Sequence, residues 1–197
     1  MIFKTACLTH VWHPENCGLN SCKDLFSLTF DDDLVRELFA VRKAILPGHW
    51  QPNYDGKGRE VWQKLVARFD ADHASIDRLR LDITLTPGAL DRVSFNLHLT
   101  TPGFRTTHQI YRLDIRQSGP HGNKLKMGHP LSGYQFPPGS SHEHHFQDSV
   151  DPGRCDFATH IPANVNTFDE AAIFLCGRLT VTNSHDFPRT AGQERLI

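Results

Sequence analysis

The sequence predicts an α+β fold: an antiparallel β-meander with three helices packed mainly on one face, next to a long histidine-rich irregular segment. Two observations carry this prediction. Apolar residues recur at helical spacing in some segments and alternate strictly with polar residues in others. The alternating segments follow one another, and the pairs Pro87-Gly88 and Pro102-Gly103 break the pattern between them, as short turns do.

Three segments show the helical pattern, namely residues 30–46, 59–70 and 168–179. The first begins after Thr29 with three aspartates, which suit the positive end of a helix dipole, and ends at Pro47. The second rests on the spacing of apolar residues alone. The third opens with Thr167 and Glu170, which have the spacing of a capping box.

Three segments alternate, namely residues 80–86, 92–100 and 111–116. Because successive side chains of a strand point to opposite faces, the apolar set predicts one dry face covered by the helices. The other face would carry the polar set: Arg80, Asp82, Arg92, Asn96, His98, Arg112, Asp114 and Arg116. The arginines suit phosphate oxygens, but ion pairs with the interleaved aspartates explain the same residues.

Composition narrows the class of protein. The chain has 197 residues and a formal net charge of −1, which favours one domain over residues 1–197 and argues against bulk capture of nucleic acid. No apolar stretch approaches the roughly 20 residues of a membrane span, and no secretory signal is evident, so we expect a cytoplasmic protein. Nucleotide-binding glycine motifs are missing, so we expect no nucleotide cofactor.

Cysteine and histidine gather in the N-terminal segment 1–27, where the ligand types of zinc recur at Cys7, His10, His13, Cys17 and Cys22. Zinc takes four such donors in a tetrahedron, so this segment predicts a zinc-stapled module. Buried free cysteines beside surface histidines explain the same pattern. Further along, a cysteine nucleophile is conceivable at Cys155 or Cys176, although Cys176 lies among apolar residues typical of a core.

The chain contains 13 histidines, and seven of them lie between residues 108 and 160. On an extended segment His142 and His144 point to the same side, where two imidazoles can hold a divalent metal or act as acid and base. His121, His129 and His160 are near them in the chain. So long an irregular stretch, residues 117–165, is typical of a functional region, although a histidine-rich surface loop is the simpler alternative.

Part of the chain resembles a widespread group of small uncharacterised bacterial proteins, often encoded in mobile or defence-type gene neighbourhoods. The resemblance rests on Arg112-Leu113-Asp114-Ile115, on the turn 119–123 with His121 and Asn123, and on His142-x-His144-x-Phe146 before a capped helix. It covers residues 92–183. It implies that His121, Asn123, His142 and His144 belong to one site, and it brings no established activity.

Two hypotheses of function follow. The first is a metal-dependent or histidine-based phosphodiester hydrolase of nuclease type. In it His121, His142 and His144 act as ligands or as acid and base, Asn123 orients a substrate oxygen and Arg112 offsets phosphate charge. It requires His121 and His144 to lie within about 10 Å of one another. The second is a non-catalytic interaction or regulatory protein with a structural histidine cluster.

The sequence favours zinc as the divalent cofactor and nucleic acid or a protein as the partner, with no membrane. The predicted metal ligands are His142, His144 and His129 in the irregular segment, and Cys7, His10, Cys17 and Cys22 at the N-terminus.

Overall fold

The computed structural model describes residues 32–46, 48–58, 60–71, 74–86, 89–100, 107–150 and 155–187, all within one compact unit. The Cys/His-rich segment 1–27, with its predicted ligands Cys7, His10, Cys17 and Cys22, lies outside the described residues. Among the residues that are described, no helix has the length and apolarity needed to span a bilayer.

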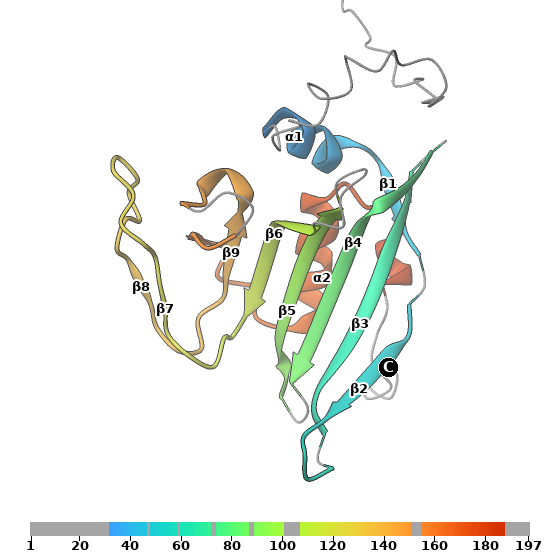
Figure 1. Ribbon diagram of the computed structural model, residues 1–197, viewed down its shortest axis with the longest axis horizontal. Helices are drawn as coiled ribbons and strands as arrows, with labels where there is room; N and C mark the ends of the chain where they lie inside the picture. Colours follow the sequence, from blue (N-terminus) through green and yellow to red (C-terminus); the bar gives the residue numbers. More distant parts are fainter. Residues whose placement is uncertain are drawn as a thin grey trace, which may run out of the picture. The chain divides into compact units, whose positions relative to one another are not determined.

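One antiparallel sheet forms the centre of the unit (Figure 1). Its strands are β1 (Lys43–Ile45), β2 (Trp50–Tyr54), β3 (Glu60–Ala71), β4 (Ala74–Thr86), β5 (Ala89–Thr100), β6 (Thr107–Ile115), β9 (His142–His145) and β10 (Ala158–His160). Their order is β1-β3-β4-β5-β6-β9-β10, and β2 also pairs with β3. The predicted meander is therefore confirmed as β4-β5-β6, and the structure extends it by β3 on one side and by β9 and β10 on the other.

The prediction of a helix over residues 59–70 is wrong, because these residues form β3. Leu65, Ala67 and Phe69 alternate inward and are buried, whereas Val66 between them is 41% exposed. The apolar residues also fit a helical spacing, and pairing with β4 along most of the strand decides between the two patterns. The described residues therefore contain two α-helices, α1 (Asp32–Ala40) and α2 (Phe168–Arg178), instead of the three predicted.

The predicted helix over residues 30–46 ends earlier than expected. α1 stops at Ala40, and Lys43–Ile45 leave the helix to pair with β3 as β1. The ammonium group of Lys43 is buried and donates to the backbone carbonyls of Phe39, Val41 and Leu179. These carbonyls lie at the C-terminal ends of α1 and α2, where a positive charge is favourable, so Lys43 joins the two helix ends.

The core lies between the sheet and α2. The predicted dry face is confirmed, since each of its members is at most 6% exposed: Leu81, Ile83, Leu85, Val93, Phe95, Leu97, Leu99, Tyr111, Leu113 and Ile115. α2 contacts β5 and β6 and brings Phe168 within 5.7 Å of Phe95, measured between ring centroids. Its predicted capping box is present: Thr167 accepts from the backbone of Glu170, whose side chain accepts from the backbone of Thr167.

The histidine-rich segment is less irregular than predicted. It contains β9 and β10 of the sheet, the 3-10 helix η3 (Phe146–Asp148) and a small two-stranded ribbon of β7 (His121–Gly122) and β8 (Gln135–Phe136). A second 3-10 helix, η4 (Ser184–Asp186), follows α2. We call residues 121–136 the lobe; Figure 1 shows this ribbon beside β9. The lobe matters for function because it brings His121 to the sheet.

Candidate metal centre

The pairing of β6 with β9 places the polar residues of the two strands side by side. Arg112 lies opposite His144, and Asp114 lies opposite His142. Because side chains alternate along a strand, His142 and His144 share one face with Arg112 and Asp114, while Glu143 and His145 face the α2 side. The prediction that His142 and His144 point the same way is confirmed by ring centroids 5.0 Å apart.

His121 completes the group from the lobe. Its ring centroid lies 5.2 Å from that of His142 and 4.8 Å from that of His144, well inside the limit that the hydrolase hypothesis requires. One nitrogen of each of the three rings lies within 4.8 Å of the others. Phe136, which pairs with His121 across the lobe, packs its ring on His142 at 4.8 Å and closes one side of the group. The three histidines could thus hold one metal ion.

Burial makes these nitrogens unusual. His142 and His144 are fully buried, yet Nδ1 of each has no hydrogen-bond partner among the described residues, and Nε2 of His121 has none there either. Nε2 of His142 and Nε2 of His144 both lie 3.5 Å from one carboxylate oxygen of Asp114. Buried polar atoms are nearly always paired, because an unpaired one loses its water without compensation. A buried cluster in which three imidazole nitrogens have no partner and two others share one carboxylate oxygen is typical of a metal-binding site.

Asp114 lies beside the three histidines. Its Oδ2 atom is 3.5 Å from Nε2 of both His142 and His144, and 2.7 Å from Nε of Arg112. Burial alone would raise the pKa of Asp114, but its interactions with His144 and Arg112 outweigh this effect and hold the pKa well below its usual range. The carboxylate is therefore ionised at neutral pH, and its charge favours a cation in the cluster.

The imidazoles of His121 and His142 are in the form that binds metal. Burial lowers the pKa of His142 to about 4, although the charge of Asp114 opposes the shift. Burial also lowers the pKa of His121, and the charge of Asp114 partly opposes this. Both rings are consequently neutral at pH 7, so a metal would not have to displace a proton from either.

Two predicted site residues lie elsewhere. Asn123 is buried, and its amide is bonded to the backbone of Ala158 and Leu131 instead of pointing to a place where a substrate oxygen would bind. His129, predicted as a metal ligand, accepts the backbone N–H of Leu131 and packs on Phe157 at 4.2 Å. Asn123 therefore holds the lobe, and His129 is not in the histidine group of the described structure.

The polar face continues from the histidines across the sheet. One row of directly paired residues runs from Val66 through Asp82, Asn96 and Arg112 to His144. Asp82 pairs with Lys64 at 3.0 Å and with Arg80 at 2.9 Å, and Asp114 pairs with Arg112. Ion pairs, the simpler of the two interpretations of this face, are therefore confirmed for Arg80 and Arg112.

The two described cysteine thiols are unsuited to nucleophilic catalysis. Cys155 is buried and its thiol donates to the carbonyl of Gln109 at 3.2 Å. Burial raises the pKa of Cys155 well above its usual range and that of Cys176 to about 11, so neither forms a thiolate at neutral pH.

Sequence reasoning missed the role of two acidic residues. Asp114 appears there only as an ion-pair partner, because its place opposite His142 depends on the register of β6 and β9. Glu143 is 3% exposed and accepts hydrogen bonds from Tyr111 and Arg178 on the α2 side of the sheet. The alternation of side chains along His142–His145 could have revealed this role. It places Glu143 on the apolar face of the strand, where an acidic residue requires hydrogen-bond partners.

Comparison with known proteins adds no further evidence, since no family model, curated protein or solved structure matches the chain. The resemblance to small bacterial proteins stays a prediction, and the function has to be argued from the site.

Proposed function

We propose that the protein binds one divalent transition metal ion, zinc in the first place, through His121, His142 and His144, and uses it to hydrolyse phosphodiester bonds. The unpaired buried nitrogens of the three histidines carry the first part of this proposal. Zinc is the best fit because neutral imidazole and carboxylate are among its preferred ligands, and because calcium and magnesium prefer sites made of oxygen atoms alone.

The spacing between Asp114 and two of the histidines agrees with this choice. In a tetrahedral zinc site, bonds of about 2.0–2.1 Å place the ligand atoms about 3.3 Å apart. The oxygen of Asp114 lies 3.5 Å from a nitrogen of His142 and of His144. At this separation Asp114 can serve as a fourth ligand or accept a hydrogen bond from a water in the fourth position. Its low pKa suits either role better than that of a general base.

The surroundings favour an anionic substrate. On the polar face that adjoins the histidines, the basic residues Lys64, Arg68, Arg80 and Arg112 outnumber the carboxylates of Asp70, Asp82 and Asp114. The side chain of Arg112 is 30% exposed and lies next to Asp114, so it can meet a phosphate oxygen near the metal. A bound metal would lower the pKa of a coordinated water and supply the nucleophile for hydrolysis.

A structural metal is the second candidate, and burial favours it. His142 and His144 are fully buried, and the third ligand, His121, comes from a lobe whose two strands pair only with each other. A metal held by four protein ligands would fasten the lobe to the sheet and would leave no position for substrate.

The test uses the full chain, produced without a polyhistidine tag, stripped of metal by a chelator and titrated with zinc. We expect His121→Ala and His144→Ala to bind one zinc ion fewer per chain than the wild type. His185→Ala, a change at an exposed histidine, should bind as many as the wild type. Counting the difference separates this centre from any zinc held by the N-terminal cysteines.

Hydrolysis of bis(p-nitrophenyl) phosphate and of a single-stranded oligonucleotide then decides between the candidates. A catalytic centre predicts zinc-dependent activity that His144→Ala reduces by about 100-fold or more. A structural centre predicts no activity and a large zinc-dependent rise in the melting temperature of the wild type. Equal zinc content of wild type, His121→Ala and His144→Ala would refute both.

A further inference from the structure

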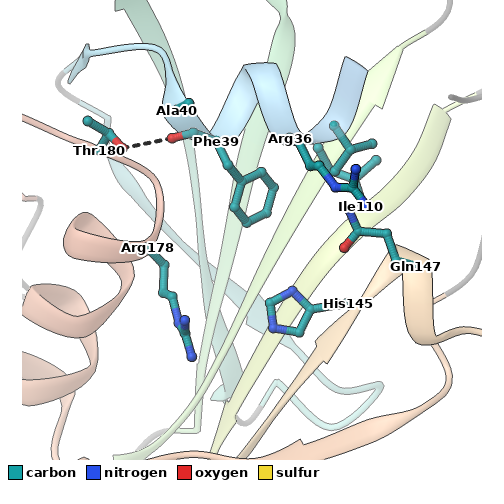
Figure 2. A pocket seen from close by; sticks show the side chains of 9 residues that line it. Arg36, Phe39, Ala40, Ile110, His145, Gln147, Arg178 and Thr180 are labelled. Carbon is teal, nitrogen blue, oxygen red and sulfur yellow. Dashed lines mark hydrogen bonds between the residues drawn. The ribbon is translucent and has the colours of Figure 1, made fainter. Parts of the chain in front are cut away.

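A second cluster of charged residues lies on the other side of β9 from the histidines. The cluster consists of Glu143 and His145 from β9, Tyr111 from β6 and Arg178 from the last turn of α2. Above this cluster is a cavity of about 380 Å³, within the roughly 300–1,000 Å³ of natural small-molecule sites. Figure 2 shows Arg178 and His145 on its two sides, below the ring of Phe39.

The polar part of the cavity is held in place by a buried carboxylate. Glu143 is 3% exposed, and it accepts a hydrogen bond from the hydroxyl of Tyr111 at 2.8 Å and from the guanidinium of Arg178 at 2.7 Å. Nε2 of His145 lies 3.4 Å from the same oxygen that Arg178 contacts. Glu143 therefore fixes the orientation of two side chains that line the cavity, as a supporting carboxylate does in a ligand site.

Arg178 keeps most of its hydrogen-bonding capacity. Its guanidinium donates once to Glu143 and lies over the ring of Phe174 at 5.0 Å, and its side chain is 45% exposed. Since a guanidinium has five N–H donors in a planar fork, the others are available to an incoming oxygen pair. The carboxylate of Glu143, which holds Arg178, is buried and does not line the cavity, so the cavity meets the guanidinium instead of the carboxylate.

Apolar side chains form another part of the lining. Val35 and Phe39 approach from α1, and Ile110, which is fully buried, comes from β6. The side wall is formed by Thr180, whose hydroxyl donates to the carbonyl of Phe39 at 2.8 Å and whose φ is 54°. A β-branched residue rarely adopts this left-handed conformation, so the contact that joins the end of α2 to α1 is maintained against backbone strain.

We propose that this cavity binds a small organic monocarboxylate, with the carboxylate on the guanidinium of Arg178 and an apolar tail against Val35, Phe39 and Ile110. An anion is favoured because the guanidinium of Arg178 lines the cavity, whereas its partner Glu143 is buried behind it. An apolar tail is favoured because α1 and β6 contribute the apolar side chains of Val35, Phe39 and Ile110 to the walls. This site is independent of the metal centre, since its residues alternate with the histidine ligands along β9.

The experiment measures binding of octanoate to the full-length chain by calorimetry, with 1-octanol as the uncharged probe of the same length. We expect octanoate to bind with a dissociation constant of about 1 mM or below, and octanol more weakly. Arg178→Gln should weaken octanoate binding about tenfold or more and leave octanol binding unchanged. Arg92→Gln, a change at an exposed arginine of β5, is the matched control and should bind octanoate like the wild type.

A second variant keeps the test decisive if Arg178→Gln disturbs the fold. Ala40 is exposed and lines the cavity, so Ala40→Trp fills the space from its rim without changing the core. It should abolish binding of both probes. Failure of the wild type to bind octanoate would overturn the proposal, and so would octanoate binding that neither Arg178→Gln nor Ala40→Trp reduces.

Discussion

The side-chain amide of Asn123 pairs with the backbone of Ala158 in the way that the backbone of a neighbouring strand would. The side-chain Oδ1 of Asn123 accepts the backbone N–H of Ala158 at 2.7 Å, and its Nδ2 donates to the carbonyl of Ala158 at 2.9 Å. Nδ2 also donates to the carbonyl of Leu131 at 3.1 Å. One buried amide therefore pairs with the backbone N–H and carbonyl at the edge of β10 and holds the lobe that carries His121.

The first prediction concerns this amide. Asn123→Ala removes three hydrogen bonds and leaves buried backbone groups unpaired, so the free energy of unfolding should fall by about 2–4 kcal/mol. Zinc affinity should fall as well, because His121 is no longer held in position. Urea unfolding and zinc titration measure the two effects. Asn166→Ala, at an exposed asparagine, should change neither by much, and an Asn123→Ala protein with normal stability would contradict the role of the amide.

The second prediction concerns Asp114. Asp114→Asn removes the charge beside two of the three imidazoles, so the dissociation constant for zinc should rise about 10–100-fold. Competition with a chelating dye measures this constant. Asp82→Asn is the matched control, because Asp82 is also a buried carboxylate of the same face, paired with Lys64 and Arg80. Equal zinc affinities of the two variants would show that Asp114 has no part in the centre.

The third prediction concerns Lys43. Lys43→Met keeps the length of the side chain but leaves the carbonyls of Phe39, Val41 and Leu179 without their buried donor. The free energy of unfolding should fall by about 2–4 kcal/mol, since several buried acceptors lose a charged partner. Chemical unfolding measures the loss. Lys57→Met, at an exposed lysine, should stay within about 0.5 kcal/mol of the wild type, and a similar value for Lys43→Met would refute the prediction.

The fourth prediction concerns the stability of the protein at acidic pH and the part that Asp156 plays in it. Burial would raise the pKa of Asp156, but hydrogen bonds from Ser149, Lys124 and the backbone of Val150 lower it from 3.8 to about 2. The folded protein therefore binds this proton less readily than the unfolded chain. The stabilisation is complete above pH 4 and is lost as the pH falls toward 2.

Asp156→Asn should accordingly reduce the free energy of unfolding by about 1–2 kcal/mol at pH 7, a value discounted for partial exposure. The difference from the wild type should shrink as the pH falls from 4 to 2, which urea unfolding at several pH values measures. Asp186→Asn, at an exposed aspartate, serves as the control. A difference that stays constant down to pH 2 would mean that the carboxylate is not stabilised by these contacts.

The strands of the sheet could be predicted where the order of apolar and polar residues fits a strand and does not also fit a helix. Residues 80–86 alternate strictly, and every apolar member is buried. Residues 59–70 fit two periods at once, and the choice depends on whether β4 is there to pair with them, which no local pattern states. The same holds for Lys43–Ile45, which join the sheet although they continue a helical spacing.

The candidate site shows the same division. The common direction of His142 and His144 follows from strand geometry alone, so it could be predicted. The position of His121 beside these two residues depends on how the lobe packs against the sheet. The family resemblance predicted that His121 belongs to the same site, whereas the periodicity did not. The part played by Asp114 needs the register between β6 and β9. The bonds of Asn123 to Ala158 join positions 35 residues apart, which no spacing rule predicts.

The four residues of β9 serve two purposes at once, since the first and third face the histidine cluster and the second and fourth face the cavity beside α2. An insertion or deletion of a single residue before this strand would turn every side chain to the opposite side. Imidazoles would then lie among the apolar groups under α2, and a carboxylate would meet Asp114. Both sites would be lost together, so the length of the connection between β8 and β9 should tolerate far less variation than its composition.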